Sequence, residues 1–182
     1  MFKHVGINDK KTWDFTLSKW KKEVRVLGDE GVFLALDIEK RFLGLKQLAG
    51  KESNVHGYFL VKKKNTCASS LLEVAHALPN FKKPWLKLLQ ITLRPSLLPA
   101  SNGGKVSEEA AKVLVNSVSH AIDLIYKEHP SSELKVYGRT LEMKALFDCM
   151  VESPDLIKQM DNIGLGVKTE GNWLIILKKN GK

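Results

Sequence analysis

WLKLLQITLR, the stretch from Trp85 to Arg94, is mostly apolar and predicts a strand. The loop after it holds Gly103, Gly104 and Lys105, and a helix is expected from Ser107, its N-cap, to about residue 129. A helix that begins behind a strand and a glycine loop presents free backbone N–H groups and a positive dipole end to an anion. The order therefore predicts an α/β arrangement with a candidate phosphate site at this loop, although glycines before a helix also serve turn geometry alone.

The segments after this loop continue the alternation of helices and strands. The helix has an expected core stripe at Ala111, Leu114, Val118, Ile122 and Ile125. A strand is expected at Leu134–Tyr137, a helix from Leu141, a further helix capped by Ser153 and Pro154, and two closing strands that end in WLIIL.

The first third of the chain combines helical and strand patterns. Lys3–Ile7 is expected to be a strand, and Trp13, Leu17 and Trp20 recur at helical spacing behind the N-cap Asp9. A turn at Gly28–Gly31 and two apolar runs, Val32–Ile38 and Phe42–Leu48, predict a hairpin.

Two further strands are expected before Trp85. Val55–Val61 is the first of them. Leu71–Leu78 fits a short helix or a strand, and Pro79, which ends the run after eight residues, favours the strand. We expect one domain over residues 1–182, because the chain has the size of a domain and no linker or repeat.

The charge favours acidic partners. The net charge is +9, and residues 1–64 hold 14 Lys and Arg against 8 Asp and Glu, so +6 of it lies in the first third. This positive charge would attract nucleic acid, a phosphorylated cofactor or an acidic protein. The alternative is that the surface lysines only keep the protein soluble. No apolar run approaches the roughly 20 residues of a membrane span, so no membrane partner is expected.

The cysteines and histidines indicate neither a disulfide framework nor a metal site. Cys67, in a polar loop, and Cys149, on an expected apolar helix face, are the only cysteines, so a reducing, cytoplasmic setting is expected. The five histidines lack HExxH or Cys/His ligand spacing, and we therefore predict no metal.

From Gly31 to Lys179 the order of expected elements resembles that of the GNAT (general N-acetyltransferase) superfamily. The early hairpin with its FLG return, the strand Trp85–Arg94, the glycine loop with its helix, and the strand LKVYGR (Leu134–Arg139) carry the likeness. The resemblance implies an α+β fold, with a single domain built on a central mixed, mostly antiparallel sheet flanked by helices. It also implies an acyl-CoA such as acetyl-CoA, with the strand Leu89–Leu93 along its pantetheine arm and Gly103, Gly104 and Lys105 at its diphosphate. Leu93 and Arg94 are the further expected cofactor-binding residues.

Two positions depart from the family pattern. Ala100 and Ser101 stand where the phosphate loop usually has Arg or Gln, and Phe147 is followed by Asp148 instead of the usual tyrosine acid. The resemblance thus implies either an acyl-CoA-dependent N-acyltransferase or a non-catalytic relative.

Amine acylation needs a base for the ammonium proton and an acid for the thiolate. Glu73, on a strand expected near Trp85–Arg94, is the candidate base, and Tyr137 is the candidate acid. The alternatives are a solvated Glu73 and a buried, hydrogen-bonded Tyr137.

A non-enzymatic protein that binds nucleic acid or an acidic partner through its basic first third is the competing functional hypothesis. Its contact surface would comprise Lys19, Lys21, Lys22, Arg25 and Lys62–Lys64. The sequence also leaves open a homodimer formed through an apolar edge strand.

Overall fold

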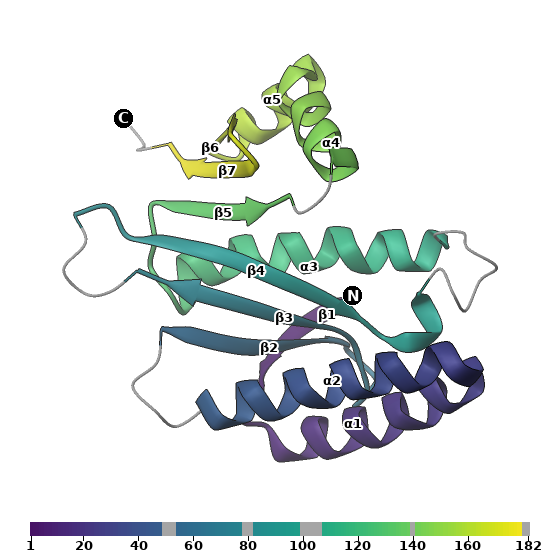
Figure 1. Ribbon diagram of the computed structural model, residues 1–182. Helices are drawn as coiled ribbons and strands as arrows, with labels where there is room; N and C mark the ends of the chain where they lie inside the picture. Colours follow the sequence, from purple (N-terminus) through teal and green to yellow (C-terminus); the bar gives the residue numbers. More distant parts are fainter. Residues whose placement is uncertain (49–53, 78–81, 99–106, 139–140, 180–182) are drawn as a thin grey trace. The chain divides into compact units, whose positions relative to one another are not determined.

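A computed structural model describes residues 1–48, 54–77, 82–98, 107–138 and 141–179 (Figure 1). The chain divides into two compact units: unit 1 comprises Met1–Val74 and Gln90–His120, and unit 2 comprises Ala75–Leu89 and Ala121–Lys182. The helices and strands are, in chain order, β1 (Phe2–Gly6), α1 (Lys10–Val24), α2 (Gly28–Leu48), β2 (Val55–Lys62), β3 (Ala68–His76), β4 (Trp85–Leu93), α3 (Glu108–Lys127), β5 (Glu133–Tyr137), α4 (Leu141–Glu152), α5 (Pro154–Asn162), β6 (Leu165–Glu170) and β7 (Trp173–Lys178).

The strands form a seven-stranded sheet in the order β1-β2-β3-β4-β5-β7-β6. Among the described pairings, β4 and β5 are parallel, whereas β1–β2, β5–β7 and β6–β7 are antiparallel. The predicted α+β class with a mixed, mostly antiparallel sheet is confirmed. No helix in the described part of the chain combines the length and the apolarity that crossing a membrane requires.

The predicted hairpin at Val32–Leu48, and with it the likeness to the early GNAT hairpin, is wrong because these residues form helix α2. Leu34, Ile38, Phe42 and Leu45 recur at spacings of four, four and three, which places them on one helical face. Ile38, Phe42 and Leu45 are buried, and Leu34 packs against the same core. The expected turn at Gly28–Gly31 also falls inside this helix.

Helix α1 begins as predicted and is joined to the sheet by hydrogen bonds. Asp9 caps it, with Oδ1 accepting from the Thr12 N–H at 2.7 Å. Trp20 Nε1 donates to the Ala68 carbonyl at 3.1 Å, and the Ala68 N–H donates to Thr16 Oγ1 at 3.0 Å. The start of β3 is therefore held by one face of α1.

The core of unit 1 is aromatic. The Phe42 ring lies 5.0 Å from Trp13, 5.5 Å from Trp20 and 5.7 Å from Phe59, centroid to centroid. Leu71 of β3 belongs to this cluster, whereas Ser70 bonds Ser117 of α3. Since neighbouring side chains of a strand point to opposite faces, α1 and α2 cover one face of unit 1's sheet and α3 the other.

The core stripe predicted for α3 is displaced by one residue. Ala111 is exposed, and Leu114, Val118 and Ile122 are only half-buried. The fully buried positions are instead Ala110, Val113, Ser117, Ala121, Leu124 and Ile125. The small side chains among them allow the helix to approach the sheet closely, which periodicity of large apolar residues does not reveal.

Unit 2 is built on β5 and the hairpin β6–β7. β5 pairs with β7 from Glu133↔Leu177 to Tyr137↔Trp173. The hairpin turns at Gly171 and Asn172, where Gly171 has φ 59°, a value that glycine adopts without a steric penalty. Its core is largely aliphatic and includes Leu86, Leu88, Leu124, Ile125, Leu134, Val136, Leu165, Leu174 and Ile176.

Candidate functional site

The edge of β4 is the feature on which the acyl-CoA hypothesis depends. The parallel ladder joins Trp85↔Glu133 through Leu88↔Val136 and then stops, although β4 continues to Leu93. In the described residues, no strand pairs with β4 on this side beyond Leu88. Backbone N–H and C=O groups from Gln90 to Leu93 therefore lie on an edge that a ligand could hydrogen-bond.

Arg94, at the end of this edge, is held by Glu23 of α1. Its Nε donates to the two carboxylate oxygens of Glu23 at 2.8 and 3.0 Å, and its Nη2 donates to the same carboxylate. Burial raises the pKa of Glu23, but the hydrogen bonds and charge of Arg94 outweigh it, so that the pKa of Glu23 lies below its usual value. An anion at the Arg94 guanidinium would have to compete with this carboxylate.

The start of α3 already carries negative charge. Ser107 Oγ accepts from the Ala110 N–H at 3.1 Å, which confirms the predicted N-cap. Glu108 pairs with Lys112, and Glu109 pairs with Lys62, whose hydrogen bond lowers the pKa of Glu109. These carboxylates oppose a phosphate at the helix end.

The predicted phosphate loop comes between β4 and α3 in the chain. Gly103, Gly104 and Lys105 lie outside the described residues, as do Ala100 and Ser101. Leu93, the neighbouring predicted contact, is half-buried at the end of β4.

Glu73 lies on β3, as predicted, between the buried Leu72 and Val74. Its side chain is half-buried and shares the face of Leu71, on which α1 and α2 pack. Among the described residues, the Glu73 carboxylate has no hydrogen-bond or ion-pair partner. A carboxylate in this state can accept a proton without first breaking an ion pair.

Tyr137 lies at the end of β5 and belongs to an aromatic–lysine cluster of unit 2. Its ring is 4.8 Å from Trp173, and Lys87 Nζ lies 5.1 Å above Trp173 and 4.5 Å above Trp85. The Tyr137 side chain is 38% exposed, which does not fit the alternative of a buried tyrosine. It is therefore accessible to a substrate.

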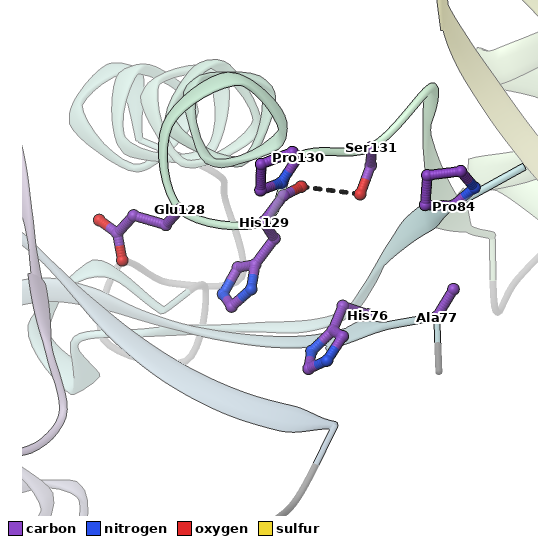
Figure 2. Close-up of a pocket in the computed structure, with 7 residues that line it drawn as sticks. All are labelled: His76, Ala77, Pro84, Glu128, His129, Pro130 and Ser131. Carbon is purple, nitrogen blue, oxygen red and sulfur yellow. Dashed lines mark hydrogen bonds between the residues drawn. The ribbon is translucent and has the colours of Figure 1, made fainter. Parts of the chain in front are cut away.

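A histidine pair that the sequence analysis missed lies in a pocket of unit 2 (Figure 2). His76 ends β3 and His129 follows α3, and their rings stack at 5.2 Å with an interplanar angle of 11°. The residues are far apart in the chain and have no ligand spacing. His76 is three residues from Glu73 on β3, so the two side chains point to opposite faces of the strand.

Cys67 lies in a loop, as predicted, but is buried there, and the predicted packing of Cys149 on an apolar helix face is wrong. Cys67 is buried directly before β3, where it packs with Trp20 and Leu71, and burial raises the pKa of its thiol. Cys149 is exposed. The apolar neighbours of Cys149 in the sequence therefore do not place it in a core.

Part of the basic first third is neutralised by local carboxylates. Lys21 Nζ lies 2.7 Å from Glu39, and Lys62 pairs with Glu109. These two lysines are members of the proposed contact surface for nucleic acid or an acidic protein. The contacts thus give that hypothesis no added support, and it stays a prediction.

No protein-family model matches the sequence, and no curated protein matches it either. Among solved structures, the KacTA–DNA complex contains a chain that is 14% identical, with 98% of this chain and 94% of that chain covered and a TM-score of 0.51. The N-acetyltransferase PseH of Campylobacter jejuni, in complex with acetyl coenzyme A, is 14% identical over 100% of both chains with a TM-score of 0.49. An acetyltransferase from Thermus thermophilus is 12% identical over 96% of both chains with a TM-score of 0.45.

At these identities the likeness concerns the fold alone. The two lower TM-scores are below 0.5, so the fold assignment depends on the chain of the KacTA–DNA complex and on the strand order β1-β2-β3-β4-β5-β7-β6. The parallel β4–β5 pair with α3 between its strands in the chain is part of the same pattern. The chain has a GNAT-like fold.

Proposed function

We propose that the protein binds an acyl-CoA along the edge of β4 and transfers its acyl group to an amine. The observation that carries this proposal is the β4–β5 ladder, which stops at Leu88 while β4 runs on to Leu93. The amide groups of a pantetheine arm can add to such an edge as a strand would. The net charge of +9 favours a polyanionic ligand.

The binding residues follow from this placement. The backbone from Gln90 to Leu93 would bond the pantetheine amides, with Leu93 and Arg94 at its diphosphate end. Because Glu23 engages the Arg94 guanidinium and two carboxylates flank the start of α3, the phosphates depend on Gly103, Gly104 and Lys105. This loop is the part of the proposed site where one added negative charge should have the largest effect.

The proposed chemistry uses Glu73 as the base and Tyr137 as the acid. Glu73 would accept a proton from the acceptor ammonium, and the amine nitrogen would then attack the thioester carbonyl. A C–N bond forms, the C–S bond breaks, and Tyr137 would give its phenolic proton to the leaving thiolate. The second proton of the attacking nitrogen would then pass through solvent to the Tyr137 phenolate, which restores the acid. Each proton transfer of this kind contributes about 10²- to 10⁴-fold to a rate.

Binding is tested first, by thermal unfolding with acetyl-CoA. A ligand at about 100 times its dissociation constant adds ~2.7 kcal/mol to the free energy of unfolding, so the melting temperature should rise. Gly104→Asp should abolish the rise by placing a carboxylate at the diphosphate. Gly44→Asp is the matched control, because a Cβ at Gly44 of α2 meets nothing within 4 Å. The proposal is overturned if the melting temperature of the wild type does not rise at about 1 mM acetyl-CoA, because any dissociation constant would then exceed the range usual for a cofactor.

Catalysis is tested separately, by CoA release with a panel of amines. Glu73→Gln and Tyr137→Phe should each lower kcat by about 10²-fold or more while leaving the acetyl-CoA thermal shift in place. Tyr126→Phe is the control, since Tyr126 is also exposed, at 50%, and has no proposed role. A thermal shift without CoA release from any amine would identify a binding protein and exclude the transferase.

A further inference from the structure

The strongest feature outside the proposed acyl-CoA site is the pair of His76 and His129 in unit 2. Their rings are nearly parallel, and a ring nitrogen of one lies within 4.8 Å of a ring nitrogen of the other. Both residues line a cavity of about 250 Å³. Figure 2 shows the two imidazoles side by side. Both side chains are half-buried, so solvent and small solutes can reach them.

Hydrogen bonds hold the backbone on both sides of the pair. The His129 N–H donates to the Leu124 carbonyl at 2.9 Å, and Ser131 Oγ donates to the His129 carbonyl at 2.7 Å. Next to His76, the Ala77 N–H donates to the Trp85 carbonyl at 2.9 Å. The two imidazoles therefore project from positions that are set by the fold, as a preorganised ligand pair requires.

The pocket suits a cation. Glu128 lines it and adds negative charge, while no lysine or arginine is among the described residues that line it. In Figure 2 the Glu128 carboxylate points away from the imidazoles, so it contributes charge and not a ligand atom. Neutral imidazole is a preferred donor for zinc, copper and nickel.

We propose that His76 and His129 bind a borderline divalent transition-metal ion, with Zn²⁺ as the reference case. Two nitrogens at Zn–N distances of about 2.0–2.1 Å in a tetrahedral site lie roughly 3.3 Å apart. The ring nitrogens of His76 and His129 lie within 4.8 Å of each other, so they must approach by at most about 1.5 Å. Side-chain rotation can supply this movement. The ion would tie the end of β3 to the end of α3, with water or further donors completing its coordination.

The test uses the full-length chain without a histidine tag, in a Cys149→Ser background because the exposed thiol of Cys149 would also bind Zn²⁺. Zn²⁺ is titrated by calorimetry. His76→Ala and His129→Ala should each lose one equivalent of Zn²⁺ or bind it at least 10- to 100-fold more weakly, since even outer-shell changes cost about that much.

Two control variants define the site. His4→Ala should retain this equivalent, although it removes a histidine of another pair, with His4 Nδ1 3.3 Å from His120 Nδ1. Glu128→Gln should weaken binding less than either pocket histidine variant. Zn²⁺ should also raise the melting temperature of the background protein but not that of His76→Ala.

A measurement that needs no histidine variant guards against variants that fail to fold. Imidazole ¹⁵N spectra of the background protein should show shifts for His76 and His129 on adding one equivalent of Zn²⁺. The proposal is overturned by the absence of Zn²⁺ binding, by unchanged His76 and His129 signals, or by an equivalent that both pocket variants retain.

Discussion

The two units use aromatic side chains in opposite ways. Unit 1 buries Trp20, Phe42 and Phe59 almost completely, at 0–1% exposure, in one packed cluster. Unit 2 builds its core mostly from leucine, isoleucine and valine, and leaves Tyr137 and Trp173 partly exposed beside Lys87.

This difference separates residues that hold the fold from residues that can meet a ligand. Removing a fully buried ring leaves a cavity that rigid neighbours cannot fill, whereas a surface ring leaves space that water fills. Stability should thus be concentrated in the aromatic cluster of unit 1, and Tyr137 and Trp173 should be replaceable without unfolding.

Trp20→Ala should produce the largest effect. We expect it to lower the free energy of unfolding by about 3–5 kcal/mol, because it removes a buried ring and the hydrogen bond to the Ala68 carbonyl. Trp173→Ala, at a half-exposed ring, should cost no more than about 2 kcal/mol. Urea unfolding of both variants measures the contrast, and equal losses would contradict it.

Glu23→Gln tests the ion pair of unit 1 and should rank second. The side chains of Glu23 and Arg94 are 14% and 27% exposed, so the neutral amide should cost about 1–3 kcal/mol. Asp148→Asn is the unit 2 control, because its pair with Lys144 is more exposed and should contribute about 0.5 kcal/mol or less.

The same variant has a signature in the pH dependence of stability. The pKa of Glu23 is lower in the folded protein than its usual value of 4.5, so its contribution is complete above that value and is lost as the pH falls through the folded pKa. Glu23→Gln should therefore lose stability less steeply than the wild type between about pH 5 and pH 2. Parallel curves over this range would show that Glu23 contributes no pH-dependent stability.

Most of the order of elements could be predicted from the sequence, and the failure at α2 has a local cause. VFLALDI and FLGLKQL are rich in apolar residues, so alternation and helical spacing compete within short windows. Only the stripe Leu34, Ile38, Phe42 and Leu45, read across both runs, indicates a helix. The partner that decides between these patterns is the aromatic core, which is not visible in the local sequence.

The candidate sites divide in a similar way. Glu73 and Tyr137 were placed on the correct strands because β3 and β5 are short, bounded runs, but their chemical roles stay predictions. The engagement of Arg94 by Glu23 could not be predicted, since α1 and the end of β4 are brought together only by the fold. The same holds for His76 and His129.

A buried hydroxyl pair gives the third contrast. Ser70 Oγ and Ser117 Oγ are 2.8 Å apart in the interior of unit 1. Ser70→Ala leaves one buried hydroxyl with fewer partners and should cost about 1–2 kcal/mol, with a measurable coupling energy in a double-mutant cycle with Ser117→Ala. Ser132→Ala in unit 2 removes an exposed hydrogen bond to the Pro84 carbonyl and should change unfolding by about 0.5 kcal/mol or less. Strictly additive losses for Ser70 and Ser117 would show that the pair is not coupled.

The smallest contrast is between two helix caps, one in each unit. Asp9 accepts the Thr12 N–H at 2.7 Å, and this hydrogen bond lowers the pKa of Asp9, whereas Ser153 accepts the Leu156 N–H at 3.4 Å. Asp9→Ala should cost about 1 kcal/mol, and Ser153→Ala, which loses a long and weak hydrogen bond, about 0.5 kcal/mol. An ionised cap also interacts with the helix dipole. Asp9→Asn should therefore keep most of the stabilisation by the wild-type cap at low pH, where Asp9 is protonated, and less of it at neutral pH, where Asp9 is ionised. Urea unfolding at both pH values measures these steps, and a larger loss for Ser153→Ala would mean that the end of α4 and the start of α5 depend on this cap more than its geometry indicates.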